Sequence, residues 1–431
     1  MSLEFTLCLL SLFMLAGIGM PIAYAILIAS FVYLGVGGQG VGLAGKVLLD
    51  GMYGSFILLA VPLFIVAANI MNAGTISDRL LRFCVGLVGR FKGGLGHVNV
   101  VASLIFSGMS GSAVADAAGI GKIIIEMMTK SGHYTRGYAA AITAASATIG
   151  PIIPPSIPMV LYALVSNTSI GFLFLGGIGP GLLMGVVLMV QNYIIASRRN
   201  FGTEDAVPLT ELPRLTFEAF PALLMPAILL YGIYGGVTTP TEAAAVAAFY
   251  ALILAAVFYR ALRLKAFYHI LVDSARSSAA VGLVIGGALI LNYIVAAENI
   301  PGLVAGALVG LDVSPLAFLI GVNILLLLLG CVLDASTIIL VIIPLFLPAC
   351  RELGIDLVHF GVVAVVNCMI GLITPPYGIL LFVINAVTRI PLAEIIREVI
   401  PFLIVLVLAL LAMILFPGIV LFLPRLMGYP G

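Results

Sequence analysis

Two kinds of helix break, each occurring twice, contain the residues that could do chemistry. The first kind is a polar, glycine-containing tip, at Ser107–Ser112 and again at Gly330–Ser336. The second kind is a double proline, within Gly150–Ser156 and again within Gly371–Gly378. Proline lacks an amide hydrogen and clashes with the carbonyl one turn earlier, so an apolar helix unwinds there. Unwound backbone inside a membrane persists only where it lines a cavity or binds something.

The chemistry offered by these breaks is the binding of a cation and an anion. Freed carbonyls, together with Ser and Thr hydroxyls, are oxygen ligands suited to a hard cation such as Na+. The N-terminal ends of half-helices carry partial positive charge and suit a carboxylate. A tip that meets a double-proline break would therefore form an ion-and-anion site near mid-membrane, once in each half. Proline and glycine also act as plain kinks in membrane helices. Four breaks in matched pairs, however, favour the interpretation that they form binding sites.

Two carboxylates follow the tips, Asp116 and Asp334. A charge inside a membrane is costly, so each needs a reason to be there. One explanation is cation coordination or support of the ion-binding loop. The other is an N-cap on the returning helix, for which Asp is favoured. Both explanations can apply to the same residue. Lys122, with Glu126 one turn later, predicts an ion pair inside the first hairpin.

The composition of the chain indicates a membrane protein. Of 431 residues, 63% are hydrophobic and 9% are charged, and the mean hydropathy is +1.28. A soluble domain needs about a quarter of its residues charged. The net charge of +1 gives no indication of a nucleic-acid partner. The five cysteines and four histidines lack metal or redox spacing, so we expect no cofactor, no transition metal and no enzyme activity.

Apolar runs predict an all-α polytopic membrane protein with about ten transmembrane helices. The predicted crossings are roughly 4–19, 21–36, 53–73, 138–168, 170–195, 217–235, 241–259, 277–297, 358–388 and 400–423. Two further stretches, 94–130 and 314–350, are each interrupted near the middle by a tip. Their halves are shorter than the ~20 residues that a crossing needs. We therefore expect two re-entrant helical hairpins.

The chain also repeats itself. Ile149–Pro155 matches Ile370–Pro376, which lies 221 residues later. At offsets of about 218 and 219, the tip before Asp116 parallels the tip before Asp334, and Gly19–Ala25 parallels Thr238–Ala244. We expect a first repeat at 1–196, a cytoplasmic linker at 197–216 and a second repeat at 217–431. Each repeat would hold five crossings, a hairpin and an interfacial arm (74–92 and 298–313). Because five is odd, the repeats must be inverted.

Basic residues agree with this inverted arrangement. When 74–93 is placed inside, 15 of the 19 Lys and Arg residues fall in cytoplasmic segments. Such a bias is typical of bacterial inner-membrane proteins. It places the mouth of the first hairpin in the cytoplasm and the mouth of the second in the periplasm, together with both chain ends. Segments such as 38–52 are then short periplasmic loops.

These motifs resemble the large membrane subunit of tripartite ATP-independent periplasmic (TRAP) transporters, over essentially the whole chain. The matching segments are Pro62–Met71, Ser107–Asp116, Ile149–Ser156, Thr239–Ala244, Gly354–Asp356 with Phe360 and Gly361, and Gly371–Pro376. The resemblance implies an elevator-type ion-transporter fold, driven by a sodium gradient and importing a small organic anion such as a C4-dicarboxylate or a sugar acid. It also implies two partners, a four-helix small membrane subunit and a periplasmic substrate-binding protein. Because the chain starts at the first large-subunit helix, we expect the small subunit to be a separate chain.

The residues expected to bind sodium or substrate lie at the four breaks. In the first half they are Ser107, Ser110, Gly111, Ser112, Asp116, Gly150, Pro154, Pro155 and Ser156. In the second half they are Gly330, Asp334, Ser336, Gly371, Thr374, Pro375, Pro376 and Gly378.

Three alternative functions fit the sequence less well. A stand-alone sodium/divalent-anion symporter would share hairpins and repeats, but its usual Ser-Asn-Thr tip signature is missing from both tips. An intramembrane protease could use two aspartates, but neither Asp116 nor Asp334 has the expected flanking residues. A channel would not explain two hairpins of opposite orientation.

Overall fold

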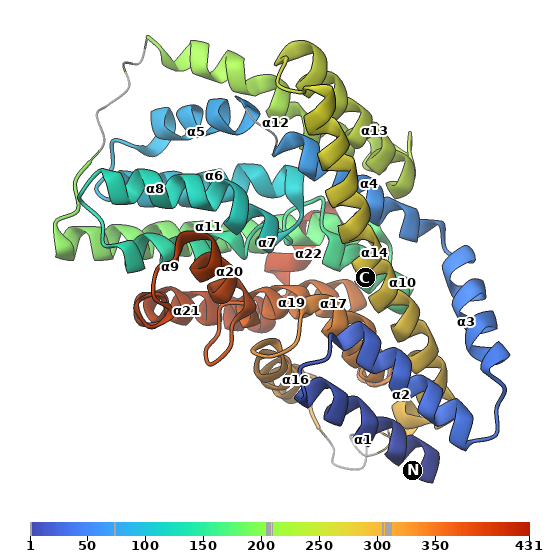
Figure 1. Cartoon of the computed structure of the whole chain (residues 1–431). Helices are drawn as coiled ribbons and strands as arrows, with labels where there is room; N and C mark the ends of the chain where they lie inside the picture. Colours follow the sequence, from blue (N-terminus) through green and yellow to red (C-terminus); the bar gives the residue numbers. More distant parts are fainter. Residues whose placement is uncertain (1, 73–74, 204–207, 209, 304–305, 307–312) are drawn as a thin grey trace.

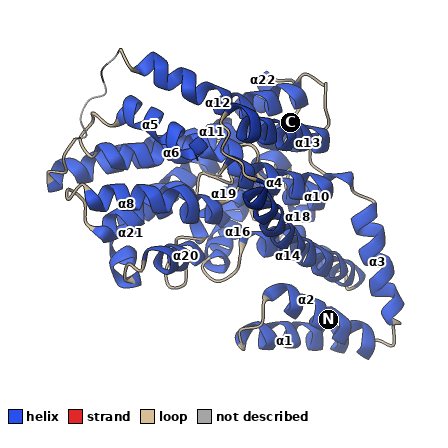
Figure 2. Ribbon diagram, turned by 45° about the horizontal axis from the view of Figure 1, so that its top comes forward, coloured by secondary structure: helices blue, strands red, loops and turns tan. Residues whose placement is uncertain are grey.

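The structure, a computed structural model, is all-helical wherever it is described. It describes residues 2–72, 75–203, 208, 210–303, 306 and 313–431, and these include no strand (Figure 2). Five of the described helices are long and apolar enough to cross a bilayer: α11 (Ile170–Arg199), α12 (Leu212–Tyr234), α13 with its π-helical end (Pro240–Phe258), α14 (Leu264–Ala297) and α21 (Leu392–Leu415). They overlap five of the ten predicted crossings, although the last predicted crossing, 400–423, runs past the end of α21 at Leu415.

The other apolar helices are shorter or bent. Among them are α1 (Leu3–Gly17) and α2 (Ile22–Val36). Helix α3 (Val41–Tyr53) meets the segment Phe56–Met71, which contains α4 (Ala60–Met71), at 72°. The prediction of a loop at 38–52 was therefore wrong. Lys46, Asp50 and three glycines lower the hydropathy of this segment and hide its helical spacing of apolar residues.

The two double-proline crossings each form two helices. The first consists of α9 (Arg136–Ala147) and α10 (Ile157–Ser166), and the second of α19 (Leu357–Gly371) and α20 (Ile379–Thr388). Residues 137–147 and 358–371 are buried without exception, so α9 and α19 form the centre of the molecule. Side-chain caps begin both helices, since Thr135 accepts from the amide of Tyr138 and Asp356 accepts from the amide of His359.

Both hairpin stretches fold in the same order of elements. The first has α6 (Gly94–Ser110), α7 (Ala113–Asp116), a π-helix (Ala117–Gly121) and α8 (Lys122–Lys130). The second has α16 (Pro315–Gly330), α17 (Ala335–Thr337), a π-helix (Ile338–Ile342), a 3-10 turn (Ile343–Leu345) and α18 (Leu347–Glu352). Glu126 pairs with Lys130 at 3.8 Å, so the predicted partner, Lys122, was wrong.

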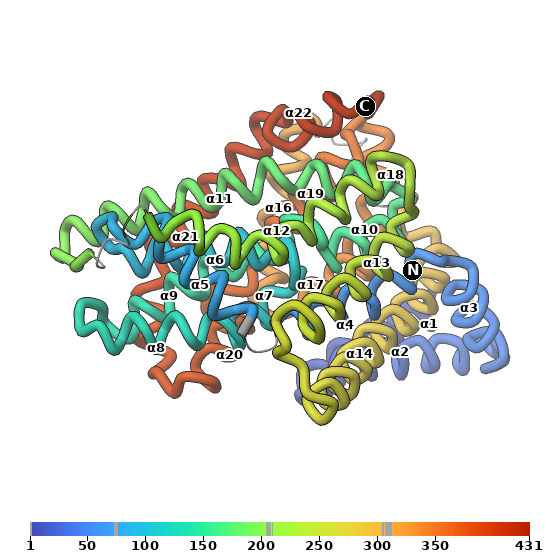
Figure 3. The backbone as a smooth tube through the Cα atoms, turned by 90° about the horizontal axis from the view of Figure 1, so that it is seen from above, coloured from blue at the N-terminus to red at the C-terminus, as the bar shows by residue number. Residues whose placement is uncertain are grey.

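The helices fall into two packed groups, visible in Figures 1 and 3. Helices α1–α4 pack with α12–α14. Helices α6–α11 pack with α16–α22. The last of these, α22, is Gly418–Leu426. Helix α5 (Thr75–Val88) contacts both α6 and α12 and so joins the groups. It buries Leu80, Leu81 and Cys84 and exposes Asp78 and Arg82, as an amphipathic arm would. The second expected arm, 298–313, lies largely outside the described residues.

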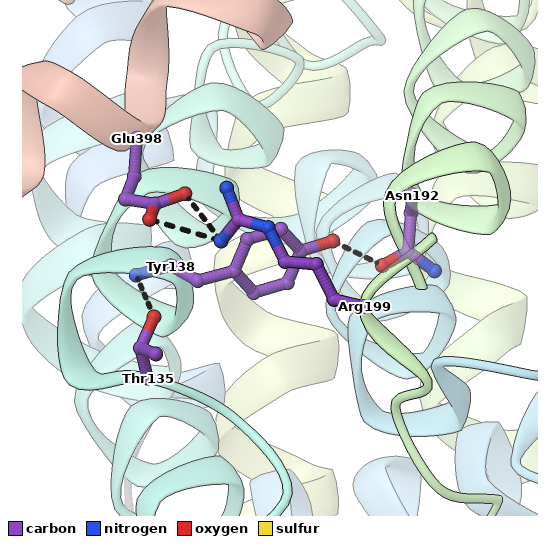
Figure 4. Close-up of polar contacts among 5 residues, drawn as sticks. All are labelled: Thr135, Tyr138, Asn192, Arg199 and Glu398. Carbon is purple, nitrogen blue, oxygen red and sulfur yellow. Dashed lines mark hydrogen bonds and ion pairs between the residues drawn. The ribbon is translucent and has the colours of Figure 1, made fainter. Parts of the chain in front are cut away.

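A polar cluster fastens three helices of the second group at one end (Figure 4). The guanidinium of Arg199, at the end of α11, pairs with the carboxylate of Glu398 on α21 at 2.9 Å. The same guanidinium lies 5.8 Å from the ring centroid of Tyr138 on α9. The Tyr138 hydroxyl donates to Oδ1 of Asn192, again on α11, at 2.6 Å. These contacts hold α9, α11 and α21 together as one unit.

Candidate functional site

The first hairpin reverses direction at a short polar turn. Helix α6 ends at Ser110, and Gly111 adopts the left-handed conformation (φ 59°) that glycine accommodates without strain. Ser112 then caps α7, because its hydroxyl accepts a hydrogen bond from the amide of Ala115 at 3.3 Å. The tip therefore presents the N-terminal end of a half-helix, as the sequence predicts.

Asp116 lies one turn beyond this cap and is buried. The hydroxyl of Ser110 donates to its Oδ1 at 2.5 Å. Its Oδ2 is buried and has no hydrogen-bond partner among the described residues. A buried carboxylate oxygen without a partner is costly and calls for a cation or a donor. Asp116 is not the N-cap of α7, since Ser112 holds that position, so cation coordination and support of the tip loop are the two explanations that remain.

The tip touches the first double-proline break. A Cβ atom at Gly150 would lie 2.4 Å from Oδ2 of Asp116, and a Cβ at Gly111 would lie 2.5 Å from the carbonyl oxygen of Pro155. Only glycine permits such approaches. The Pro154 carbonyl lies further off, 3.8 Å from a Cβ built at Gly108. The carboxylate of the tip therefore faces the break, and a carbonyl of the break faces the tip.

Two serines of the predicted set bond mainly to their own segments. Ser156 caps α10 by accepting from the amide of Met159 at 3.2 Å, and its hydroxyl donates to the carbonyl of Pro151. The hydroxyl of Ser107 donates to the carbonyl of Leu104 at 2.6 Å, within α6. Ser110, Gly111, Asp116, Gly150 and Pro155 thus form the compact part of the first site.

The second tip meets the second break in a related way. A Cβ at Gly330 would lie 3.1 Å from the Cα of Gly371, so two backbones are in contact there. The amide of Gly378 donates to the carbonyl of Cys331 at 3.2 Å and ties the break to the tip. The hydroxyl of Thr374 donates to the carbonyl of Ile370 at 2.8 Å. Pro375 and Ser336 are half-buried beside these contacts, and Pro376 is exposed.

Asp334 plays a different role from Asp116. Its Oδ2 accepts from the amide of Thr337 at 3.2 Å, and its Oδ1 accepts from the hydroxyl of Thr337 at 2.5 Å, so it caps α17. The position equivalent to Asp334 is therefore Ser112, the cap of α7, 222 residues earlier. The sequence pairing of Asp116 with Asp334 was wrong, because alignment by residue type ignored where each returning helix begins. Asp334 stays half-exposed at the tip, with lone pairs free for a ligand.

Polar pairs that sequence reasoning missed join each hairpin to its broken helix. Asn99 on α6 donates to the hydroxyl of Thr143 at 2.6 Å and accepts from the hydroxyl of Ser146 at 3.0 Å, both on α9. Asn367 on α19 donates to Oδ1 of Asn323 on α16 at 2.8 Å. The available signal was an amide side chain within an apolar helix, because such groups need a buried partner.

The two sites interlock. The second half of the first broken helix, α10, packs against α17 and the π-helix of the second hairpin. Conversely, α20 packs against α7 and the π-helix of the first hairpin. The hydroxyl of Tyr162 on α10 donates to the carbonyl of Leu357 at the start of α19, at 2.7 Å. Both sites therefore belong to a single packed unit.

Potential transition-metal ligands do not cluster in the described part of the chain. The described residues include no group of three or more His, Cys, Asp or Glu side chains that could hold a metal ion. All five cysteines are free and buried. Oxygen ligands from carbonyls, hydroxyls and carboxylates are the chemistry that these sites offer.

This architecture, all-helical with several membrane-length helices and polar breaks at its buried centre, defines a multi-pass membrane transport protein. The family described as "Tripartite ATP-independent periplasmic transporter, DctM component" matches residues 9–419. The chain belongs to this family, the large permease subunits of bacterial TRAP transporters, which confirms the resemblance seen in the sequence. It is a membrane permease and not an enzyme.

Individual relatives agree over nearly the whole length. The chain is 42% identical over 413 residues to the sialic acid TRAP transporter large permease protein SiaM of Vibrio cholerae, covering 95% of this chain and 96% of that protein. It is 40% identical over 373 residues to the C4-dicarboxylate TRAP transporter large permease protein DctM of Pseudomonas aeruginosa, covering 86% and 87%. The crystal structure of the Alcanivorax borkumensis YdaH transporter shares the fold, with a TM-score of 0.65, 16% identity and coverage of 88% and 89%.

Proposed function

We propose that this permease imports a small organic anion, such as a C4-dicarboxylate or a sugar acid, by coupling its movement to that of Na+. The observation that carries the proposal is the unpartnered Oδ2 of Asp116, buried against Gly150. A sodium ion bound there would take oxygen ligands and neutralise the carboxylate. The half-helix ends capped by Ser112 and Asp334 supply amide dipoles suited to a carboxylate substrate.

The two packed groups support an elevator mechanism. The group α6–α11 with α16–α22 holds both sites and would move as the transport unit. The group α1–α4 with α12–α14 would serve as the scaffold, joined to the transport unit by the arm α5. The two hairpins and two broken helices would be inverted repeats, with the first hairpin opening to the cytoplasm and the second to the periplasm.

The proposal includes two partners, a small four-helix membrane subunit on a separate chain and a periplasmic binding protein that delivers the substrate. The two named relatives are described as TRAP transporter permeases for sialic acid and for a C4-dicarboxylate, both carboxylates. These descriptions support the substrate class rather than one particular anion.

Reconstituted liposomes test this function. The two membrane subunits, with the matched binding protein outside, should take up the labelled anion under an inward Na+ gradient. Uptake should stop in Na+-free buffer that carries only a proton gradient, because the sites offer ion ligands and no chain of proton carriers. Sodium-independent uptake would reject the coupling. Full-rate uptake of free substrate without a binding protein would identify a stand-alone symporter.

A further inference from the structure

The two double-proline breaks differ in the residue that follows the prolines. With Ile149–Pro155 aligned on Ile370–Pro376, Ser156 corresponds to Tyr377, 221 residues later. Ser156 is fully buried, and its hydroxyl is used to cap α10. Tyr377 is 48% exposed and follows the exposed Pro376. At this position the second break is exposed, whereas the first break is buried.

Neighbouring contacts fix Tyr377 beside the second hairpin tip. The next residue, Gly378, donates its amide to the carbonyl of Cys331 in that tip at 3.2 Å. The ring of Tyr377 lies against the ring of Phe382 on α20, with centroids 4.7 Å apart and planes inclined by 30°. Within the described part of the chain the Tyr377 hydroxyl has no hydrogen-bond partner, so the ring is held while its polar end is free.

The depth of this residue decides what its hydroxyl can meet. Helix α20 has ten residues, so at ~1.5 Å per residue it covers about 15 Å. That length is about half the ~30 Å hydrocarbon core of a bilayer. Tyr377, at the inner end of α20, therefore lies near mid-membrane. A hydroxyl facing lipid there would lose its hydrogen bonds at a cost of several kcal/mol, so we expect its exposed side to face water or a polar ligand.

We infer that Tyr377 contacts the transported anion and helps to determine which anion is accepted. Its hydroxyl would donate a hydrogen bond to a carboxylate or hydroxyl oxygen of a substrate held between the two tips. The inference rests on the proposed transport function and adds a specificity residue to it. The two half-sites already differ in the bonding of Asp116 and Asp334, and the exchange of a buried Ser for an exposed Tyr adds a hydrogen-bond donor to the second half-site alone. A polar donor of this kind discriminates strongly against ligands that leave it unpaired.

Direct binding to the purified complex of the two membrane subunits tests the role in specificity without the binding protein. Dissociation constants for sialic acid and for succinate would be measured in Na+ buffer with the wild type and with Tyr377→Phe, which keeps the ring on Phe382. Of the two anions, the one that the wild type binds more tightly should bind about tenfold more weakly to Tyr377→Phe. The sodium half-saturation of binding should change less than twofold. Tyr231→Phe, a 75% exposed tyrosine on α12, is the matched control and should bind as the wild type does.

Chemical labelling tests the location even if neither anion binds measurably. In a cysteine-free background, Tyr377→Cys should react with a water-soluble methanethiosulfonate reagent. Phe249→Cys, 64% exposed on the scaffold helix α13, should not react. An unreactive Tyr377→Cys would overturn the inference, as would unchanged affinities for both anions in Tyr377→Phe. Loss of sodium dependence in the wild type would instead reject the proposed function, so the two failures are distinguishable.

Discussion

The hydroxyl of Ser110 donates to one oxygen of Asp116 at 2.5 Å, and the other oxygen of that carboxylate is buried and has no partner in the described part of the chain. Half of the carboxylate is thus fixed in orientation while the other half is left for a ligand. The free oxygen faces Gly150, where the first double-proline helix unwinds. This relationship joins a residue of the tip to a residue of the break, and it is the basis of the first two predictions.

Asp116→Asn should raise the sodium concentration for half-maximal uptake by on the order of tenfold, because the amide keeps the shape but removes the charge that attracts a cation. Sodium titration of uptake in liposomes measures this. Asp273→Asn on α14, which removes a charge from an exposed carboxylate far along the chain, is the control. Equal sodium curves for wild type and Asp116→Asn would rule out Asp116 as a sodium ligand.

Gly150→Ala should impair sodium-dependent uptake and lower stability by about 1–3 kcal/mol, because the added Cβ would lie 2.4 Å from Oδ2 of Asp116. Gly119→Ala is a matched control, since a Cβ there meets nothing within 4 Å. Thermal unfolding in detergent and uptake in liposomes would be measured for both. If the two alanine variants behave alike, the close contact between tip and break has no functional role.

The hairpin ends should lie on opposite sides of the membrane. His133 follows the first hairpin and Glu352 ends the second, and both are exposed. With single cysteines at these positions in a cysteine-free background, an impermeant maleimide added to intact cells should label Glu352→Cys but not His133→Cys. Labelling of both, or of the first alone, contradicts the inverted repeat.

Glu352→Lys should lower the apparent affinity for the binding protein, and the effect should shrink as salt is added, because exposed charges are screened. Uptake measured against binding-protein concentration at two ionic strengths checks this. Asp356, four residues later, is a less suitable position. Its Oδ1 caps α19 through the amide of His359 at 2.9 Å, so Asp356→Lys should cost about 1 kcal/mol of stability. If Glu352→Lys leaves the affinity for the binding protein unchanged, the outer end of the second hairpin is excluded as the docking site.

The sequence by itself determined the class of protein and the places where its helices break. Hydropathy, charge and the double prolines act locally, so the breaks at Pro154–Pro155 and Pro375–Pro376 could be predicted without coordinates. Caps such as Ser112 are also local, and they explain why a half-helix starts at each tip. The helix α3 was missed because its charges and glycines resemble those of a loop.

Only the tertiary structure decided which atoms meet. The approach of Gly111 to the carbonyl of Pro155 and of Gly330 to Gly371 depends on how separate helices pack, which no local pattern encodes. Packing also separated the two aspartates, since both oxygens of Asp334 are bound by Thr337 while one oxygen of Asp116 is left free. The exposure of Tyr377, at the position where the first double-proline break buries Ser156, follows from the same cause. Burial is a property of the whole packed unit and not of a residue and its neighbours in the chain.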